Sequence, residues 1–177
     1  MNTNLQRYNL VAIILHWITA LLIIYMLIWG EGLINGHGAP GSDPALHASL
    51  GLLILLLTAV RLVWRLMNPP PPDVPMSALQ QKLSHALHWA FYALLLLIPI
   101  SGLAKLDSWI AGGKHSEVAN LTFFNMFAMP HFSMTWLGSG HGLMTKLAWA
   151  LLGLHVLAAL KHQFIDKDNL IKRMSLR

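Results

Sequence analysis

The chain has 177 residues, of which 55% are hydrophobic and only 11% are charged. Soluble domains carry roughly 25% charged residues, so this composition excludes an ordinary soluble protein. The absence of cysteine excludes a disulfide framework, a thiolate zinc site, a cysteine-ligated iron–sulfur cluster and a haem attached through a C-x-x-C-H motif.

Four apolar runs are long enough to cross a bilayer, which takes about 20 residues in a helix. In chain order, we predict membrane-spanning helices over about residues 10–30, 47–67, 85–104 and 141–162. The first run is too long for a signal peptide and lacks a small-residue cleavage site, so no signal peptide is expected. The sequence therefore predicts an all-α fold, a single four-helix membrane bundle over residues 1–177.

The predicted connections differ in character. Residues 31–46 form a Gly-rich loop, and the prolines at 69–72 end the second helix firmly. Residues 105–140 are rich in aromatic side chains and Met, and we expect them to pack over one end of the bundle.

The basic residues predict the orientation of the chain. Nine of the twelve flank one set of helix ends: Arg7, Arg61, Arg65, Lys82, Lys161, Lys167, Lys172, Arg173 and Arg177. By the positive-inside rule, both termini and the proline-rich loop are cytoplasmic. Because these residues flank membrane helices and do not form one basic face, the net charge of +5 does not predict nucleic-acid binding.

Ionisable residues inside apolar runs are costly and usually functional, and four histidines there form the most informative set: His16, His47, His141 and His155. His141 and His155 are 14 residues apart, so they share one helix face and stand about 21 Å apart along the axis. His16 and His155 lie at a similar depth of roughly 10 Å, and His47 is level with His141. Two pairs at two depths predict bis-histidine ligation of two haems, because imidazole suits iron and bundle cores hold cofactors.

Two other interpretations of these histidines remain. Each histidine taken singly can cap a helix or hydrogen-bond within a bundle that holds no cofactor, and the chain would then be a membrane scaffold. Zinc or copper is the weaker alternative, because two imidazoles at each depth leave the ion short of ligands. Haem supplies four equatorial nitrogens of its own, so two histidines complete its iron coordination.

Several motifs carry a family resemblance. They are Leu15-His16-Trp17, Leu46-His47-x-Ser49-x-Gly51, the pair His85 and His88, His141, Gly153-Leu154-His155, and the tail from Lys161 to Asp168. Together they resemble the bacterial cytochrome b561 family, which is related to the haem b subunits of hydrogenases and formate dehydrogenases. The resemblance covers nearly the whole chain and is weakest over residues 107–140.

The resemblance implies a bacterial inner-membrane protein with two haem b groups, ligated by His16 with His155 and by His47 with His141. It also implies a quinone site near the cytoplasmic haem, where His88 and His162 would relay protons to ubiquinone. Another possibility makes His88 the haem ligand in place of His16.

Several further residues are candidates for contacts with the haems or the quinone. Trp17 is a candidate for lining the quinone ring pocket. Arg61 and Arg65 either bind haem propionates or are cytoplasmic flanks that reach the interface. Gly51 and Gly153 either leave room for a porphyrin edge or allow close helix packing. His37, His85, His115 and His131 carry no predicted role.

The expected function is electron transfer between the periplasmic side and a quinone at the cytoplasmic side. One branch of the resembling family oxidises superoxide and reduces ubiquinone, and another takes electrons from a periplasmic redox protein. Superoxide would be attracted by positive charge. The predicted outer segments carry three basic residues and four acidic ones: Lys105, Lys114, Lys146, Glu31, Asp43, Asp107 and Glu117. Lys105 and Lys146 could still form a local positive funnel beside the outer haem.

Overall fold

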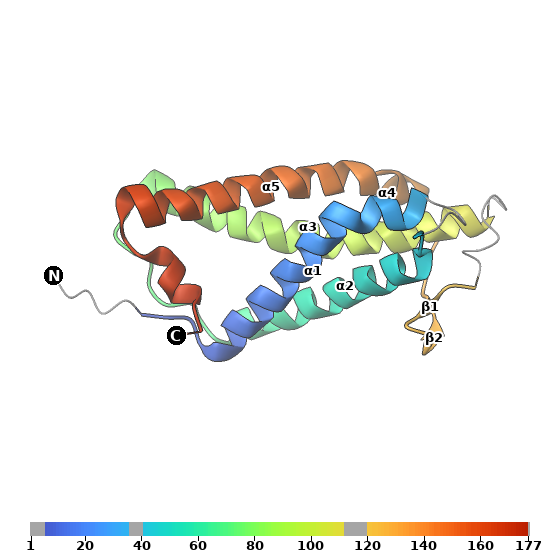
Figure 1. The fold of residues 1–177 in the computed structure, drawn as a ribbon, viewed down its shortest axis with the longest axis horizontal. Helices are drawn as coiled ribbons and strands as arrows, with labels where there is room; N and C mark the ends of the chain where they lie inside the picture. Colours follow the sequence, from blue (N-terminus) through green and yellow to red (C-terminus); the bar gives the residue numbers. More distant parts are fainter. Residues whose placement is uncertain (1–5, 36–40, 112–119, 177) are drawn as a thin grey trace.

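The computed structural model describes residues 6–35, 41–111 and 120–176. Within them, four helices are long and apolar enough to cross a membrane: α1 (Leu10–Asn35), α2 (Pro44–Met67), α3 (Ala78–Ala111) and α5 (His141–Lys161). They form an elongated bundle in which α2 packs against α1 and α3, and α3 packs against α5 (Figure 1). The predicted all-α fold with four membrane-length helices is confirmed.

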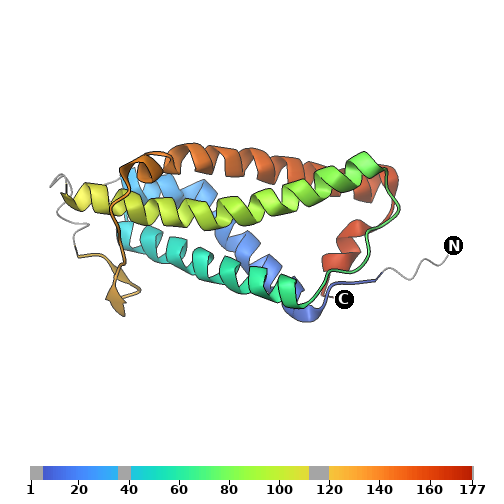
Figure 2. The same cartoon turned by 180° about the vertical axis from the view of Figure 1, so that it is seen from behind.

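The two ends of the bundle carry different segments. The first and last described residues lie together at one end, where the Tyr8 amide donates to the Arg173 carbonyl over 3.2 Å. We call this the terminal end, and it also holds the connection between α2 and α3 (Figure 2). The opposite end carries the short strands β1 (Thr122–Phe123) and β2 (Phe127–Ala128), and we call it the hairpin end.

Three helices extend beyond the predicted spans. Helix α1 continues to Asn35 and α2 begins at Pro44, so most of the predicted Gly-rich loop that the structure describes is helical. Asp43 caps α2 by accepting a hydrogen bond from the Leu46 amide (2.8 Å), and proline is favoured at the following position. Counting apolar residues finds the part of a helix inside the hydrocarbon, and misses turns that continue into the head groups.

Helix α3 also begins well before the predicted residue 85. Ser77 and Gln80 form a reciprocal capping pair, in which the Ser77 amide donates to Gln80 Oε1 and the Gln80 amide donates to Ser77 Oγ. Before this cap, Asp73 accepts hydrogen bonds from Gln81 and His85, and these partners hold its pKa below the ordinary value. His85 is therefore an exposed residue that tethers the proline-rich loop to α3.

The connection between α3 and α5 packs beside the helices at the hairpin end. Its described part contains the β-hairpin and the short helix α4 (Thr135–Ser139). Met129 is buried with Leu52 of α2 and Leu106 of α3. Gly138 brings α4 against α3 so closely that an added Cβ atom would lie 2.8 Å from the Lys105 amide nitrogen. This connection was predicted to pack over the end of the bundle. Its described part packs instead against the sides of α2 and α3 near that end.

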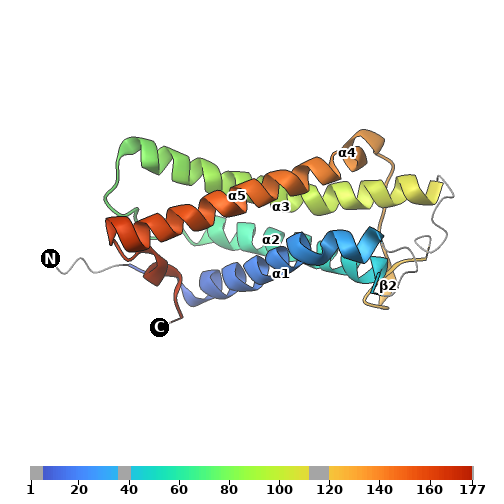
Figure 3. The ribbon, with the colours of Figure 1, turned by 45° about the horizontal axis from the view of Figure 1, so that its top comes forward.

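After α5 the chain turns back at the terminal end. A π-helical turn, η2 (His162–Asp166), leads into a 3₁₀ turn, η3 (Leu170–Met174), and Figure 3 shows this tail running from the end of α5 towards the start of α1. Arg173 is 5% exposed and donates to the carbonyls of Gln6 (3.0 Å) and Pro72 (2.7 Å). One buried guanidinium therefore joins the start of the chain, the proline-rich loop and the tail.

Candidate cofactor sites

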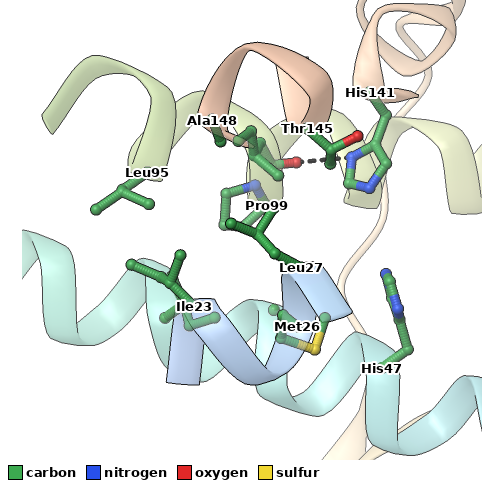
Figure 4. A pocket seen from close by; sticks show the side chains of 12 residues that line it. Ile23, Met26, Leu27, His47, Leu95, Pro99, His141, Thr145 and Ala148 are labelled. Carbon is green, nitrogen blue, oxygen red and sulfur yellow. Dashed lines mark hydrogen bonds between the residues drawn. The ribbon is translucent and has the colours of Figure 1, made fainter. Parts of the chain in front are cut away.

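At the hairpin end, two histidines face each other across the bundle. His47 stands in the first turn of α2 and His141 is the first residue of α5. Their ring centres are 6.3 Å apart with an interplanar angle of 60° (Figure 4). The first turns of α2 and α5 lie side by side, and this brings the two histidines to the same depth in the bundle, as predicted.

Both rings are oriented by hydrogen bonds at Nδ1. His47 Nδ1 donates to the Gly30 carbonyl of α1 (2.9 Å), and His141 Nδ1 donates to the Ile98 carbonyl of α3 (3.0 Å). Ser101 Oγ lies 3.0 Å from the same nitrogen of His141. A carbonyl oxygen can only accept, so the proton is on Nδ1 and Nε2 keeps its lone pair for a metal.

Two glycines hold these rings close to the backbone. A Cβ atom at Gly102 would lie 3.3 Å from Cε1 of His141, and one at Gly30 would lie 3.4 Å from the His47 ring. Sequence reasoning missed both glycines and Ser101, because only the packing of α1 and α3 against the rings reveals them. At Gly51 and Gly153 an added Cβ would meet nothing within 4 Å, which contradicts close helix packing at those two positions.

A cleft, partly open to the surroundings, extends from this histidine pair into the bundle (Figure 4). Its lining is apolar apart from the two histidines and Thr145: Ile23, Met26, Leu27, His47, Gly51, Ile54, Leu95, Ile98, Pro99, His141, Thr145 and Ala148. Such a lining suits an apolar ligand held by a few polar groups.

At the terminal end, His155 of α5 has two histidine neighbours. Its ring centre lies 6.4 Å from that of His16 on α1 and 6.1 Å from that of His88 on α3. Phe91 packs edge-on against His155 at 5.4 Å. Both predicted partners of His155 are therefore at similar distances.

Arg61 joins this layer from α2. Its Nη2 donates to Nδ1 of His16 over 2.9 Å, and its guanidinium lies over the Tyr92 ring at 5.5 Å. Because a guanidinium only donates, the neutral His16 ring carries its proton on Nε2. Coordination through Nε2 of His16 would move that proton to Nδ1 and release Arg61. Arg65 lies one turn further along α2 and forms no hydrogen bond or ion pair with any described residue.

His162 follows α5 directly and is held by the tail. Its Nδ1 lies 2.6 Å from an Asp168 carboxylate oxygen and 3.3 Å from Asp166. Lys161 binds Asp166 over 2.6 Å. Lys167 and Asn169 adopt left-handed φ angles of 55° and 60°, which turn Asp168 back towards the ring. Such angles are uncommon in residues other than glycine.

Trp17 also contacts the tail. Its indole nitrogen donates to the Met174 carbonyl over 2.8 Å, and its ring packs edge-on against His16 at 5.3 Å. The structure thus links Trp17, a predicted quinone-site residue, to the His16 ring and to η3. Among described residues, no hydrogen bond or ring contact joins His88 to His162. The remaining unassigned histidine that the structure describes, His131, pairs with Asp107 (2.8 Å), while His37 and His115 lie outside the described residues.

The spacing of the histidine rings fits a shared metal ion. A metal–imidazole bond of about 2 Å, extended to the ring centre, places two opposed ring centres about 6 Å apart. Among the described residues, the one group of three or more His, Asp or Glu close enough to share an ion is His162, Asp166 and Asp168. Neither histidine layer therefore forms a complete protein-only metal site, and a group with its own equatorial ligands fits both better.

The bundle interior also leaves room for such a group. Among described residues, the largest fully buried side chains are the small polar ones of Thr19, Thr58, Ser49 and Ser101, while large apolar side chains such as Ile54 and Leu95 keep 5–7% exposure and line the cleft. The Thr58 hydroxyl is buried without a hydrogen-bond partner. Helices of a soluble bundle would fill this space with Leu, Ile or Phe.

The family described as prokaryotic cytochrome b561 matches residues 7–175. Relatives include the probable superoxide oxidase CybB of Yersinia pestis, 33% identical over 96% of both chains. Cytochrome b561 homolog 2 of Escherichia coli is 31% identical over 96% of this chain and 91% of its own. Cytochrome b562 of Cereibacter sphaeroides is 28% identical over 94% of both chains.

Proposed function

The chain belongs to the prokaryotic cytochrome b561 family, membrane haem proteins of electron transfer, and we propose that it carries electrons between the hairpin end and a quinone at the terminal end. The observation that supports this most is the presence of two histidine layers with ring-centre separations of 6.3 and 6.4 Å. The two layers are joined by α5, on which His141 and His155 are 14 residues apart, about 21 Å along the helix axis.

In this proposal, His47 and His141 hold one haem b, and His16 and His155 hold the second. Haem b supplies one-electron redox chemistry when it is bound. The chain orients the imidazoles: the Gly30 and Ile98 carbonyls hold Nδ1–H of His47 and His141, and such bonds make Nε2 a better ligand. The apolar lining of the cleft around the first pair offers water few hydrogen-bond partners.

Arg61 and Arg65 are proposed to bind the propionates of the haem at the terminal end. Arg61 already lies at that layer, and a guanidinium can bind a carboxylate through two parallel hydrogen bonds. When Arg61 releases Nδ1 of His16, the imidazole can move its proton to Nδ1 and ligate iron through Nε2. The freed guanidinium then becomes available for a propionate.

The proposed quinone is ubiquinone, bound at the terminal end near His88, His162 and Trp17. Reduction of a quinone by two electrons requires two protons, and imidazole exchanges protons near neutral pH. His162 is suited to this task because its side chain is 15% exposed and Asp168 fixes its ring. By the positive-inside rule, this end faces the cytoplasm and both termini lie there.

The proposed electron donor at the other end is superoxide. Two superoxide ions would give up one electron each and leave as O₂, while ubiquinone takes two electrons and two protons to become ubiquinol. The 33% identity to a probable superoxide oxidase supports this reaction. Lys105 supports it too, since it is a cation at this end of the bundle, where its ammonium lies over the Trp109 ring (5.1 Å), whereas Asp107 is paired with His131.

The second candidate is a cytochrome that receives electrons from a periplasmic redox protein and has no substrate chemistry of its own. It is favoured by the near balance of charge in the outer segments, which gives an anion little long-range attraction.

Mixing the oxidised holoprotein with a superoxide source and following haem absorbance separates the two candidates. Superoxide oxidation predicts haem reduction well above an aqueous control, abolished by superoxide dismutase and slowed in Lys105→Gln. Haem reduction no faster than the control would refute superoxide as the donor and favour a protein donor.

A further inference from the structure

The tip of the β-hairpin is apolar and exposed. Met126 is 74% exposed, Phe127 49% and Phe124 43%. The rings of Phe123 and Phe127 stack at 5.0 Å, and Phe124 packs edge-on against Phe123 at 4.8 Å. We propose that this tip, residues 123–127, is a membrane anchor that inserts among the lipid head groups at the hairpin end.

The hairpin is fixed at the depth where the membrane span begins. Ser49 is 1% exposed, and its hydroxyl donates to the Thr122 carbonyl (3.2 Å) and accepts from the Phe124 amide (3.1 Å). Ser49 lies in the second turn of α2. A 24-residue helix is about 36 Å long, slightly more than the hydrocarbon core of about 30 Å, so its first turns stand at the lipid boundary.

The hairpin also points in the required direction. Figures 1 and 2, which view the bundle from opposite sides, both show the hairpin projecting sideways from the start of α2, across the helix axes. A segment that projects sideways at this depth leaves the bundle towards lipid. It does not extend along the helix axes into the aqueous phase.

The turn itself indicates that an aromatic tip serves an outside contact. The Met126 amide donates to the Phe123 carbonyl (2.8 Å), and the two central residues, Phe124 and Asn125, have φ angles of 44° and 61°. Turns with two positive φ angles favour Asn and Gly at these positions. A bulky aromatic residue there is strained, so turn formation does not explain Phe124.

The composition of this segment favours lipid over a protein partner. Residues 118–145 contain no Asp, Glu, Lys or Arg. Docking surfaces for redox proteins are expected to offer charge complementarity, which steers the encounter. Phe side chains are typical of apolar faces that enter the boundary between lipid head groups and acyl chains.

Spin labelling tests the anchor directly, because the chain has no cysteine that would compete for the label. Met126→Cys and, separately, Phe127→Cys carry a nitroxide in holoprotein reconstituted into phosphatidylcholine vesicles. Collision rates of the nitroxide with O₂, which partitions into lipid, and with a water-soluble nickel chelate are then measured. Circular dichroism checks that each variant retains the helical content of the unmodified protein.

Two labelled positions calibrate the measurement. Val60→Cys reports the lipid-facing side of α2, since Val60 is 54% exposed within a membrane span, and Lys172→Cys reports the aqueous tail. The anchor predicts that the O₂-to-nickel ratio at residues 126 and 127 is severalfold higher than at residue 172. A ratio equal to that at residue 172 overturns the proposal. Protection from both reagents also overturns it, because it would mean that protein covers the tip.

Discussion

Among individual residues, His162 illustrates how neighbouring charges select one partner from two. Both Asp166 and Asp168 approach its Nδ1, but Lys161 binds Asp166 over 2.6 Å and compensates its charge. Asp168 makes the shorter contact, and its other oxygen accepts from the Leu170 amide (3.0 Å), which fixes the carboxylate in place. Asp168 is therefore the residue that orients His162.

This difference predicts unequal effects of two matched substitutions. If His162 serves the quinone, Asp168→Asn should lower the rate of ubiquinone reduction about tenfold, the effect of roughly 1.4 kcal/mol in the activation free energy. Asp166→Asn should change that rate less than twofold, and Asp168→Glu should restore part of it. Initial rates of quinone reduction, with the haem spectrum as the fold control, make the comparison.

Equal effects of the two substitutions would contradict the orienting role of Asp168. An unchanged rate in His162→Ala would instead remove His162 from the quinone site, so the two failures can be told apart.

Among the elements, α5 sets the distance between the two candidate haems. It carries one histidine of each layer on one face, and α1, α2 and α3 supply the partners. Periodicity and depth could predict this much from the sequence, because buried histidines in apolar runs are rare. The distances do not choose between His16 and His88 as the partner of His155, and substitutions can.

Three substitutions test the ligand assignment. His141→Ala should remove only the haem at the hairpin end, so the haem-to-protein ratio falls from two to one. His16→Ala should remove the haem at the terminal end, whereas His88→Ala should retain both haems and slow quinone reduction. Haem content per purified chain is the measurement.

Loss of a haem in His88→Ala, with both haems retained in His16→Ala, would make His88 the ligand. Loss of both haems in His141→Ala at equal protein yield would contradict two independent sites.

Other parts of the elements could not be predicted from composition. The first residues of α2 and α3 depend on the Asp43 cap and on the Ser77–Gln80 pair, which lie outside the apolar runs. The contacts of Gly30 and Gly102 with the histidine rings depend on tertiary packing. The hairpin contains only two residues in each strand, too few for an alternating pattern.

At the scale of the whole molecule, the terminal end is held together by Arg173. Its side chain links Gln6, Pro72 and, through a cation–π contact of 5.7 Å, Tyr8. From the sequence, Arg173 was predicted only to be one of the basic residues that flank the membrane spans. Its packing role could not be predicted, because a buried arginine and an exposed flanking arginine look the same in the sequence.

Arg173→Ala should therefore loosen the tail without unfolding the bundle. Each lost hydrogen bond to a charged group is worth about 1.5–3 kcal/mol. We expect faster proteolysis after Lys167 and a changed Trp fluorescence, because Trp17 donates to the Met174 carbonyl. Lys172→Ala, at an exposed neighbouring position, is the matched control. Equal proteolysis rates in the two variants would contradict the anchoring role.

The whole account depends on two haems held between the helices of one bundle by the histidine layers at its two ends. The measurement that tests this most directly is the haem b content of the purified chain, together with its reduced spectrum. Two haems per chain, with the split absorption bands of two low-spin b haems, are predicted. A chain that folds with haem freely supplied and yet contains one haem or none would contradict the account.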